Sequence, residues 1–107
     1  MIWRAFIARQ PNGLLCRFST VVDTVTHYNM TEEDYITQVQ MWLYGRNREF
    51  AEREAKDTID NYIQPFSEVI RCFLPYNNTR EEFLNILRKM GDTETKIEDL
   101  NSISEEE

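Results

Sequence analysis

The side chains of this chain that could act as a nucleophile and a base are Cys16 and His27, the single histidine among 107 residues. With a carboxylate such as Asp23 they would form a thiol-catalysis set, in which the imidazole accepts the thiol proton. The simpler interpretation makes Cys16 a small core residue and His27 a solvated loop residue. We favour it, so we expect no enzyme and no catalytic residue, and a small thiol-dependent enzyme is the least favoured alternative.

Motifs for metal or cofactor binding are missing from the sequence. His27 and the two cysteines, Cys16 and Cys72, lie far apart and show no CxxC or HxxxH spacing. The three glycines fall where a turn, a helix bend and a helix cap are expected, which leaves none for a phosphate-binding loop. We therefore predict no metal site and no cofactor.

Aromatic and arginine side chains point to another chemistry, the anchoring of a protein interface. Trp, Tyr and Arg carry much of the binding energy at such interfaces. The chain has two Trp, five Tyr and six Phe, and we expect some of them outside a small core. The predicted interaction surface consists of Trp3, Arg9, Arg17, Tyr28, Trp42, Tyr44 and Tyr76.

The net charge of −7 is concentrated near the C-terminal end. Residues 1–91 carry 11 basic and 12 acidic groups, whereas residues 92–107 carry seven acids and one lysine. The nearly neutral body lacks the basic patch that nucleic-acid binding needs, so we expect no direct nucleic-acid partner. No apolar run approaches the ~20 residues of a membrane span, and the start MIWRAFIARQ has no leader-like core. We expect a cytoplasmic protein with reduced cysteines and no membrane partner.

A β-hairpin is predicted at the N-terminal end. Residues 2–9 are rich in aromatic and branched residues, residues 10–13 (QPNG) are typical of a tight turn, and residues 14–22 form the second strand. Pairing back from the turn places Ala8 opposite Cys16, Phe6 opposite Phe18 and Arg4 opposite Thr20. One face, expected to pack on helices, carries Phe6, Ala8, Cys16, Phe18 and Val22. The outer face carries Trp3, Ile7, Arg9, Leu15, Arg17 and Val21.

Two similar nonapeptides, YNMTEEDYI at 28–36 and YNNTREEFL at 76–84, mark predicted helix starts. In each, a threonine N-cap is followed three residues later by an acid that completes a capping box. The predicted pairs are Thr31 with Asp34, Thr79 with Glu82 and, more weakly, Thr95 with Glu98. We interpret the repeat as a helix-start signal and not as a duplicated binding motif.

Helical periodicity governs most of the remaining sequence. Residues 23–30 are predicted to be a connector, and residues 32–63 form one long helix or two. Residues 66–74 fit a short helix or a strand, and we favour the helix. A further helix runs from Thr79 to about Met90 and ends at Gly91.

The expected fold class is therefore α+β, with an N-terminal β-hairpin packed on three or four α-helices. Residues 1–91 form a single α+β domain. Residues 92–107 form an acidic, flexible and largely disordered tail with one turn around Ile97 and Leu100.

The stretch ARQPNGLLCRFSTVVD, followed by YNMTEEDYI, resembles the N-terminal part of small uncharacterised proteins of bacteriophages and related mobile elements. The resemblance covers about residues 5–36. It implies a bacterial cytoplasmic setting and an accessory role, such as interference with a host process. It implies no catalytic residue.

The leading hypothesis is a small non-enzymatic protein-binding module, such as a phage-encoded inhibitor of a host or defence protein. Its partner would be a bacterial host protein held by exposed aromatics and the outer hairpin face. The alternative is an acidic nucleic-acid mimic of the anti-CRISPR kind, built from the tail and from residues 32–63, which hold eight acids and four bases. A homodimer stays open, because an uncovered hairpin face or edge strand is a natural seam.

Overall fold

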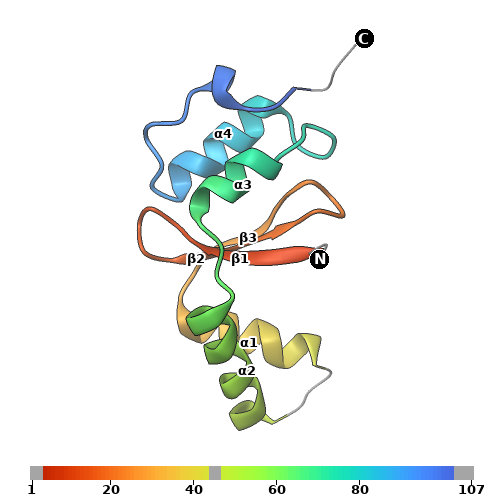
Figure 1. Cartoon of the computed structure of the whole chain (residues 1–107), viewed down its shortest axis with the longest axis vertical. Coiled ribbons are helices and arrows are strands. Elements are labelled where there is room, and N and C mark those ends of the chain that lie inside the picture. The colour runs from red at the N-terminus through yellow and green to blue at the C-terminus, as the bar shows by residue number, and fades with distance from the viewer. Residues whose placement is uncertain (1–3, 44–46, 103–107) are drawn as a thin grey trace.

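The computed structural model describes residues 4–43 and 47–102, which form an α+β molecule with a central sheet (Figure 1). The three-stranded antiparallel sheet has the order β1-β2-β3, with α1 and α2 on one side and α3 and α4 on the other. The elements are β1 (Ala5–Arg9), β2 (Leu15–Ser19), β3 (Thr24–Met30), α1 (Glu32–Trp42), α2 (Arg48–Asn61), α3 (Phe66–Cys72), α4 (Arg80–Lys89) and the 3-10 turn η1 (Ile97–Asp99).

The predicted hairpin is present with the predicted register. Ala8 lies opposite Cys16 and Phe6 lies opposite Phe18. Gly13 adopts a φ of 88° in the turn, a left-handed conformation that glycine accepts without a steric penalty. The α+β class is therefore as predicted, but the sheet is larger than a hairpin.

The third strand corrects the prediction that residues 23–30 are a connector. Its register against β2 shifts between Leu15 and Arg17 and again between Arg17 and Phe18. Asn29 also has a positive φ of 58°. Such bulges break the two-residue alternation by which a strand is recognised in a sequence. The composition of residues 24–30, with threonine, valine and tyrosine, is nevertheless typical of a strand.

Helices cover both faces of the sheet, so the prediction of an outer hairpin face is wrong for Ile7 and Leu15, which are buried. Arg9 and Val21 are exposed and Arg17 is half-buried. One cluster joins Phe6, Cys16 and Phe18 to α3 and α4. A second cluster joins Ile7 and Leu15 to α1 and α2. Each helix pair has an apolar side, and it packs this side against one face of the sheet. The homodimer stays a prediction, with an edge strand of the sheet as its remaining seam.

A network of three side-chain amides, the buried Gln10 and the exposed Asn12 and Asn29, joins the β1–β2 turn to the end of α4. The Gln10 side chain donates to the Oδ1 atoms of Asn12 and Asn29, at 2.8 and 2.7 Å. The backbone N–H of Asn12 donates to the carbonyl oxygen of Met90 at 3.2 Å. The close contact between the turn and the end of α4 explains why residue 91 is a glycine. Gly91 has a φ of 95°, and a Cβ atom at this position would lie 3.0 Å from the Asn12 backbone nitrogen.

Two of the three predicted capping boxes are present. Thr31 Oγ1 accepts from the Asp34 backbone N–H at 3.0 Å, and the Asp34 carboxylate accepts from the Thr31 N–H at 3.0 Å. Thr79 and Glu82 form the same pair of bonds at the start of α4. The third is wrong by one residue, because the residue before η1 is Lys96, whose N–H donates to the carboxylate of Asp99 at the end of η1.

The two ambiguous segments are also settled. Residues 32–63 form two helices, and the second begins after Asn47, whose side chain accepts from the Phe50 N–H at 2.8 Å. Gly45, the predicted bend, lies outside the described residues. Residues 66–72 are helical, which confirms the preferred assignment.

The segment 92–102, assigned to the tail by its charge, packs against α3 and α4. Leu100 is only 4% exposed and belongs to the core cluster on that side. The Asn101 side chain donates to the carbonyl oxygens of Arg71 and Phe73. Burial opposes the charge of Asp92, but bonds from Thr95 and Glu94 and the nearby Arg88 outweigh it and lower its pKa. The predicted turn near Ile97 is present as η1, whereas residues 103–107 lie outside the described part.

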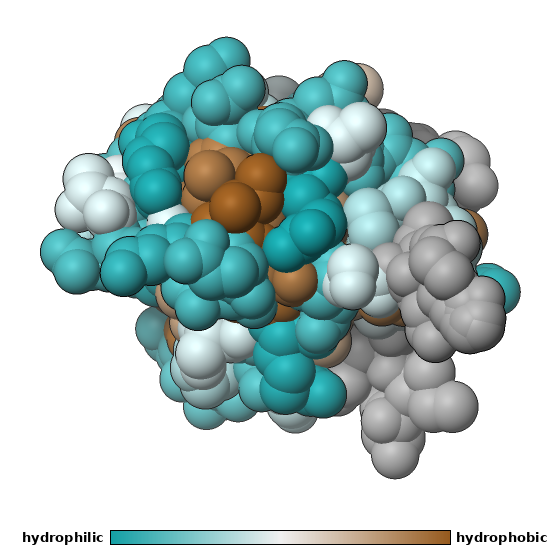
Figure 2. All heavy atoms as spheres, turned by 90° about the horizontal axis from the view of Figure 1, so that it is seen from above, coloured by the Kyte–Doolittle hydropathy of each residue, from teal (hydrophilic) through white to brown (hydrophobic). Residues whose placement is uncertain are grey.

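Seen from the α3–α4 end, the molecule presents a mainly hydrophilic surface with one central apolar area (Figure 2). Aliphatic residues of this helix pair that stay partly exposed include Ile70, Leu84 and Ile86. Tyr76, in the loop that joins α3 to α4, is 62% exposed.

We expect Thr31→Ala and Thr79→Ala each to lower the free energy of unfolding by about 1 kcal/mol, because each removes an N-cap. Urea unfolding followed by circular dichroism measures the change. Thr93→Ala is the matched control, since Thr93 is exposed and caps no helix, and we expect a change below about 0.5 kcal/mol. Equal effects of the three substitutions would contradict the helix-start interpretation of the repeat.

Candidate functional site

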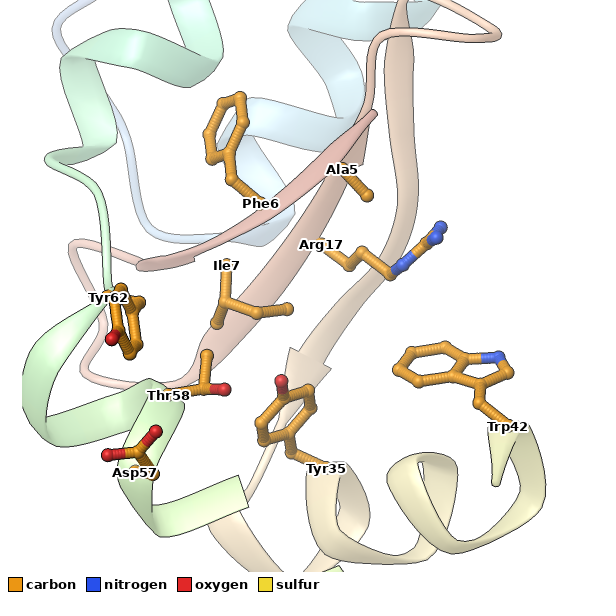
Figure 3. Close-up of a pocket in the computed structure, with 9 residues that line it drawn as sticks. All are labelled: Ala5, Phe6, Ile7, Arg17, Tyr35, Trp42, Asp57, Thr58 and Tyr62. Atoms are coloured by element: carbon orange, nitrogen blue, oxygen red, sulfur yellow. The ribbon is translucent and has the colours of Figure 1, made fainter. Parts of the chain in front are cut away.

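A pocket of about 340 Å³ opens between the sheet and the α1–α2 pair (Figure 3). This volume lies at the lower end of the range for small-ligand sites. Strands β1 and β2, both helices and the residue that follows α2 contribute to it. The lining residues are Ala5, Phe6, Ile7, Arg17, Tyr35, Trp42, Asp57, Thr58 and Tyr62.

The pocket has an apolar floor. Ile7 and Tyr35 are buried members of the cluster between the sheet and α1–α2. Tyr35 and Trp42 are seven residues apart, which is two helical turns and places them on one face of α1. Their rings meet edge to face with centroids 6.4 Å apart, an arrangement favoured by aromatic pairs.

Arg17 and Trp42 form one end of the pocket. The Arg17 Cζ atom lies 5.0 Å from the centroid of the Trp42 ring, which is a cation–π contact. The same guanidinium donates from Nη1 to Thr26 Oγ1 at 3.0 Å. Trp42 nevertheless stays 40% exposed, although it is held by aromatic and cationic neighbours. The result is a pre-positioned aromatic ring at the surface.

Arg17 differs from the arginines that form ion pairs. Within the described residues, ion pairs are made by Arg9 with Glu32, Arg48 with Glu33 and Arg71 with Glu68. Arg17 is half-buried, and no carboxylate of residues 4–43 or 47–102 forms an ion pair with it. Its positive charge is therefore available to a ligand.

His27 lies beside this end of the pocket. Its ring centroid is 5.7 Å from that of Trp42, and Nδ1 lies 2.9 Å from Thr26 Oγ1. Burial, and second the charge of Arg17, lower the pKa of His27 below its ordinary value of 6.5. His27 is thus mostly neutral at neutral pH, and Arg17 supplies the positive charge here.

The opposite end of the pocket is polar. Figure 3 shows Asp57 and Tyr62 across the pocket from Arg17 and Trp42. The Asp57 carboxylate accepts from the Asn61 side chain at 2.8 Å. Burial raises the pKa of Tyr35, whose hydroxyl is hydrogen-bonded to Thr58. The pocket therefore has a cationic end, an apolar middle and an acidic end.

The structure brings together only part of the predicted interaction surface. Arg17 and Trp42 meet at the pocket, whereas Arg9 donates to the Gly13 carbonyl oxygen and pairs with Glu32 at 3.6 Å. Tyr28 is half-buried against the other cluster, on the α3–α4 side, and Tyr76 is exposed on that side. Trp3 and Tyr44 lie outside the described residues.

Sequence reasoning did not assign Tyr35, Asp57, Thr58 or Tyr62 to a site. Tyr35 and Tyr62 lie at helical spacing from other apolar residues, a pattern typical of core positions, and Asp57 is one of several charged residues of the second helix. A signal was present, because Thr58 and Tyr62 are four residues apart and Tyr35 and Trp42 are seven apart. These spacings place each pair on one side of a helical segment. They do not show that the two helices face the same part of the sheet.

The residues of the thiol-catalysis alternative are not brought together. Cys16 is fully buried in the α3–α4 cluster, whereas His27 contacts Trp42 on α1, the helix on the opposite side of the sheet. Burial raises the pKa of Cys16 to about 12. No group of three metal-ligating side chains occurs within residues 4–43 and 47–102. In the same residues, no helix combines the length and apolar content of a membrane span.

Neither a profile of a known protein family, nor a curated protein sequence, nor a solved structure matches this chain. The geometry of the pocket is therefore the basis for a proposal on function.

We expect the Cys16 thiol to resist aromatic disulfide reagents in the folded protein. With a pKa of about 12, only about one thiol in ten thousand is ionised at pH 8. The Cys72→Ser variant isolates Cys16, and its reaction is followed by absorbance with and without denaturant. Cys16→Ser, which leaves the half-buried Cys72, is the matched control and should react faster. Rapid reaction of folded Cys72→Ser would reopen thiol chemistry.

We expect His27 to titrate below pH 6.5, as followed by the NMR shifts of its ring protons. Arg17→Gln should raise this pKa only part of the way, because burial remains. A lowered pKa means that the unfolded chain binds the proton first. The contribution of His27 to stability is thus complete above pH 6.5 and is lost as the pH falls through the folded-state pKa. A midpoint that does not move in Arg17→Gln contradicts the placement of these two groups.

Proposed function

We propose that this chain is a small non-enzymatic protein-binding module and that its partner docks over the pocket between the sheet and α1–α2. The observation that supports this most is the exposed Trp42 ring, held beside an apolar pocket by the half-buried Arg17. Tryptophan and arginine at a pre-formed pocket are the features of an interface anchor.

The neighbouring surface supports docking of something larger than a small molecule. A stable protein interface buries roughly 1,200–2,000 Å² in total, which is more than one small pocket supplies. Met41 and Tyr62, which are 64% and 49% exposed, extend the apolar surface at the ends of α1 and α2. We therefore place the partner across both helix ends, with one side chain inserted into the pocket.

The resemblance of residues 5–36 to phage proteins supports a particular kind of partner, a bacterial host or defence protein. The acidic-mimic alternative has less support in the described residues. In the first turn of α1, Glu32 and Glu33 are paired with Arg9 and Arg48, and Asp34 closes a capping box. These three acids already have structural partners.

The proposal is tested by affinity capture from bacterial extract with the tagged full-length chain, followed by binding measurements on the captured protein. Trp42→Ala should weaken binding by about 30-fold or more, the effect of an interface anchor. Tyr76→Ala is the matched control, because Tyr76 is an exposed aromatic on the other side of the sheet, and it should change affinity less than about threefold. Circular dichroism confirms that both variants are folded.

Two results count against the proposal. One is a partner that binds Trp42→Ala and wild type equally well, and the other is recovery of the bait alone. A partner that is lost at high salt but insensitive to Trp42→Ala favours acidic mimicry, because exposed charges are screened by salt.

A further inference from the structure

The chemistry of the pocket also indicates what it would hold. We infer that it takes an apolar side chain, aromatic or large aliphatic, that lies next to a carboxylate, and that Arg17 receives this carboxylate. The inference rests on the proposed function and specifies the part of the partner that enters the pocket.

The first step concerns the donors of Arg17. Its bond to Thr26 uses Nη1, and no hydrogen bond among the described residues uses Nε or Nη2. An arginine side chain presents its N–H groups in a planar fork that fits the two oxygens of a carboxylate. The Trp42 contact holds the fork in place, so little conformational entropy is lost on binding.

The second step concerns the strength of such a pair. A half-buried charge loses part of its hydration, and an opposite charge with good geometry restores the lost interaction. Trp42 and the buried Ile7 exclude water from one side of the site, which strengthens an ion pair relative to one in bulk water. His27, mostly neutral at neutral pH, neither competes for the carboxylate nor repels a cation.

The third step concerns the middle of the pocket. This part of the pocket, whose whole volume is about 340 Å³, has an apolar surface formed by Ala5, Ile7 and the rings of Tyr35 and Trp42. An aromatic side chain can meet the Trp42 ring edge to face or offset, as Tyr35 already does. A charged side chain in this middle part of the pocket would lose its hydration and gain no partner of opposite charge, which is unfavourable.

The fourth step gives the site a direction. Asp57 lies across the pocket from Arg17, so a carboxylate bound at the Asp57 end would meet a like charge (Figure 3). The carboxylate of the occupant is therefore expected at the Arg17 end. The group that faces Asp57 should be a neutral hydrogen-bond donor or a cation.

The test uses two probes of nearly the same shape, the anionic N-acetyl-L-phenylalanine and its neutral amide, added to the ¹⁵N-labelled full-length chain at neutral pH. The Trp42 indole N–H and the Arg17 Nε–H report binding, with Trp42 assigned from Trp42→Phe. We expect the carboxylate probe to shift both signals and to bind about tenfold or more tightly than the amide.

Three variants show whether Arg17 is the cause. Arg17→Gln should remove the preference for the carboxylate and keep weak, charge-independent binding. Arg17→Lys, which retains the charge but not the fork, should keep part of the preference and guards against a folding defect in the first variant. Lys89→Gln is the matched control, because Lys89 is an exposed cation of α4 on the other side of the sheet, and it should not weaken carboxylate binding.

Equal affinity for the two probes, or a preference that survives in Arg17→Gln, overturns the inference. The two proposals can fail independently of each other, because probe binding tests the chemistry of the pocket and partner capture tests the protein-binding function. If a captured partner depends on Trp42 but the two probes bind equally, the proposed protein-binding function stands and the carboxylate inference is rejected. If the carboxylate probe is preferred but no partner is captured, the inference on the pocket stands and the proposed protein-binding function is rejected.

Discussion

The constraint on which this structure depends is a three-stranded sheet that is apolar on both faces. Phe6, Cys16 and Phe18 point to one side, and Ile7 and Leu15 point to the other. A sheet this small cannot leave either set in water, so the helices divide into two pairs. The chain must then cross from one side to the other. It does so beside the edge strand β1, where the Gln64 N–H donates to the Ile7 carbonyl oxygen at 2.8 Å.

The division of the helices also creates the pocket. The α1–α2 pair covers Ile7 and Leu15 but leaves a space against Ala5 and Arg17 of the sheet. Arg17 is a long cationic side chain on an otherwise apolar face, and Trp42 covers its guanidinium at the end of α1. The bulges of β3 accompany this arrangement, since they flank the position where His27 lies opposite Arg17. The irregular strand and the candidate site are thus parts of one local structure.

Features that depend on residues close in the chain were predicted well. The QPNG turn, the register of Phe6 with Phe18 and the caps at Thr31 and Thr79 each involve groups a few residues apart or the pairing that a turn dictates. The strand at 24–30 was missed because its bulges disturb the alternation used to recognise strands. Of the candidate site, Arg17 and Trp42 were identified by residue type, since arginine and tryptophan are common interface anchors.

The partners of these two residues could not be predicted, because contacts between elements depend on which face each helix covers. Apolar stripes on the two helix pairs fit either side of the sheet equally well, and burial of apolar area has no directional preference. Only the folded chain places Asp57 and Tyr62 across the pocket from Arg17. It also buries Cys16 on the side of the sheet away from His27, and it buries Leu100, a residue of the acidic C-terminal segment, in the core. Local hydrogen bonding and periodicity can therefore be read from the amino acids, whereas the site arises from packing between distant segments, which becomes definite only when both faces of the sheet are covered.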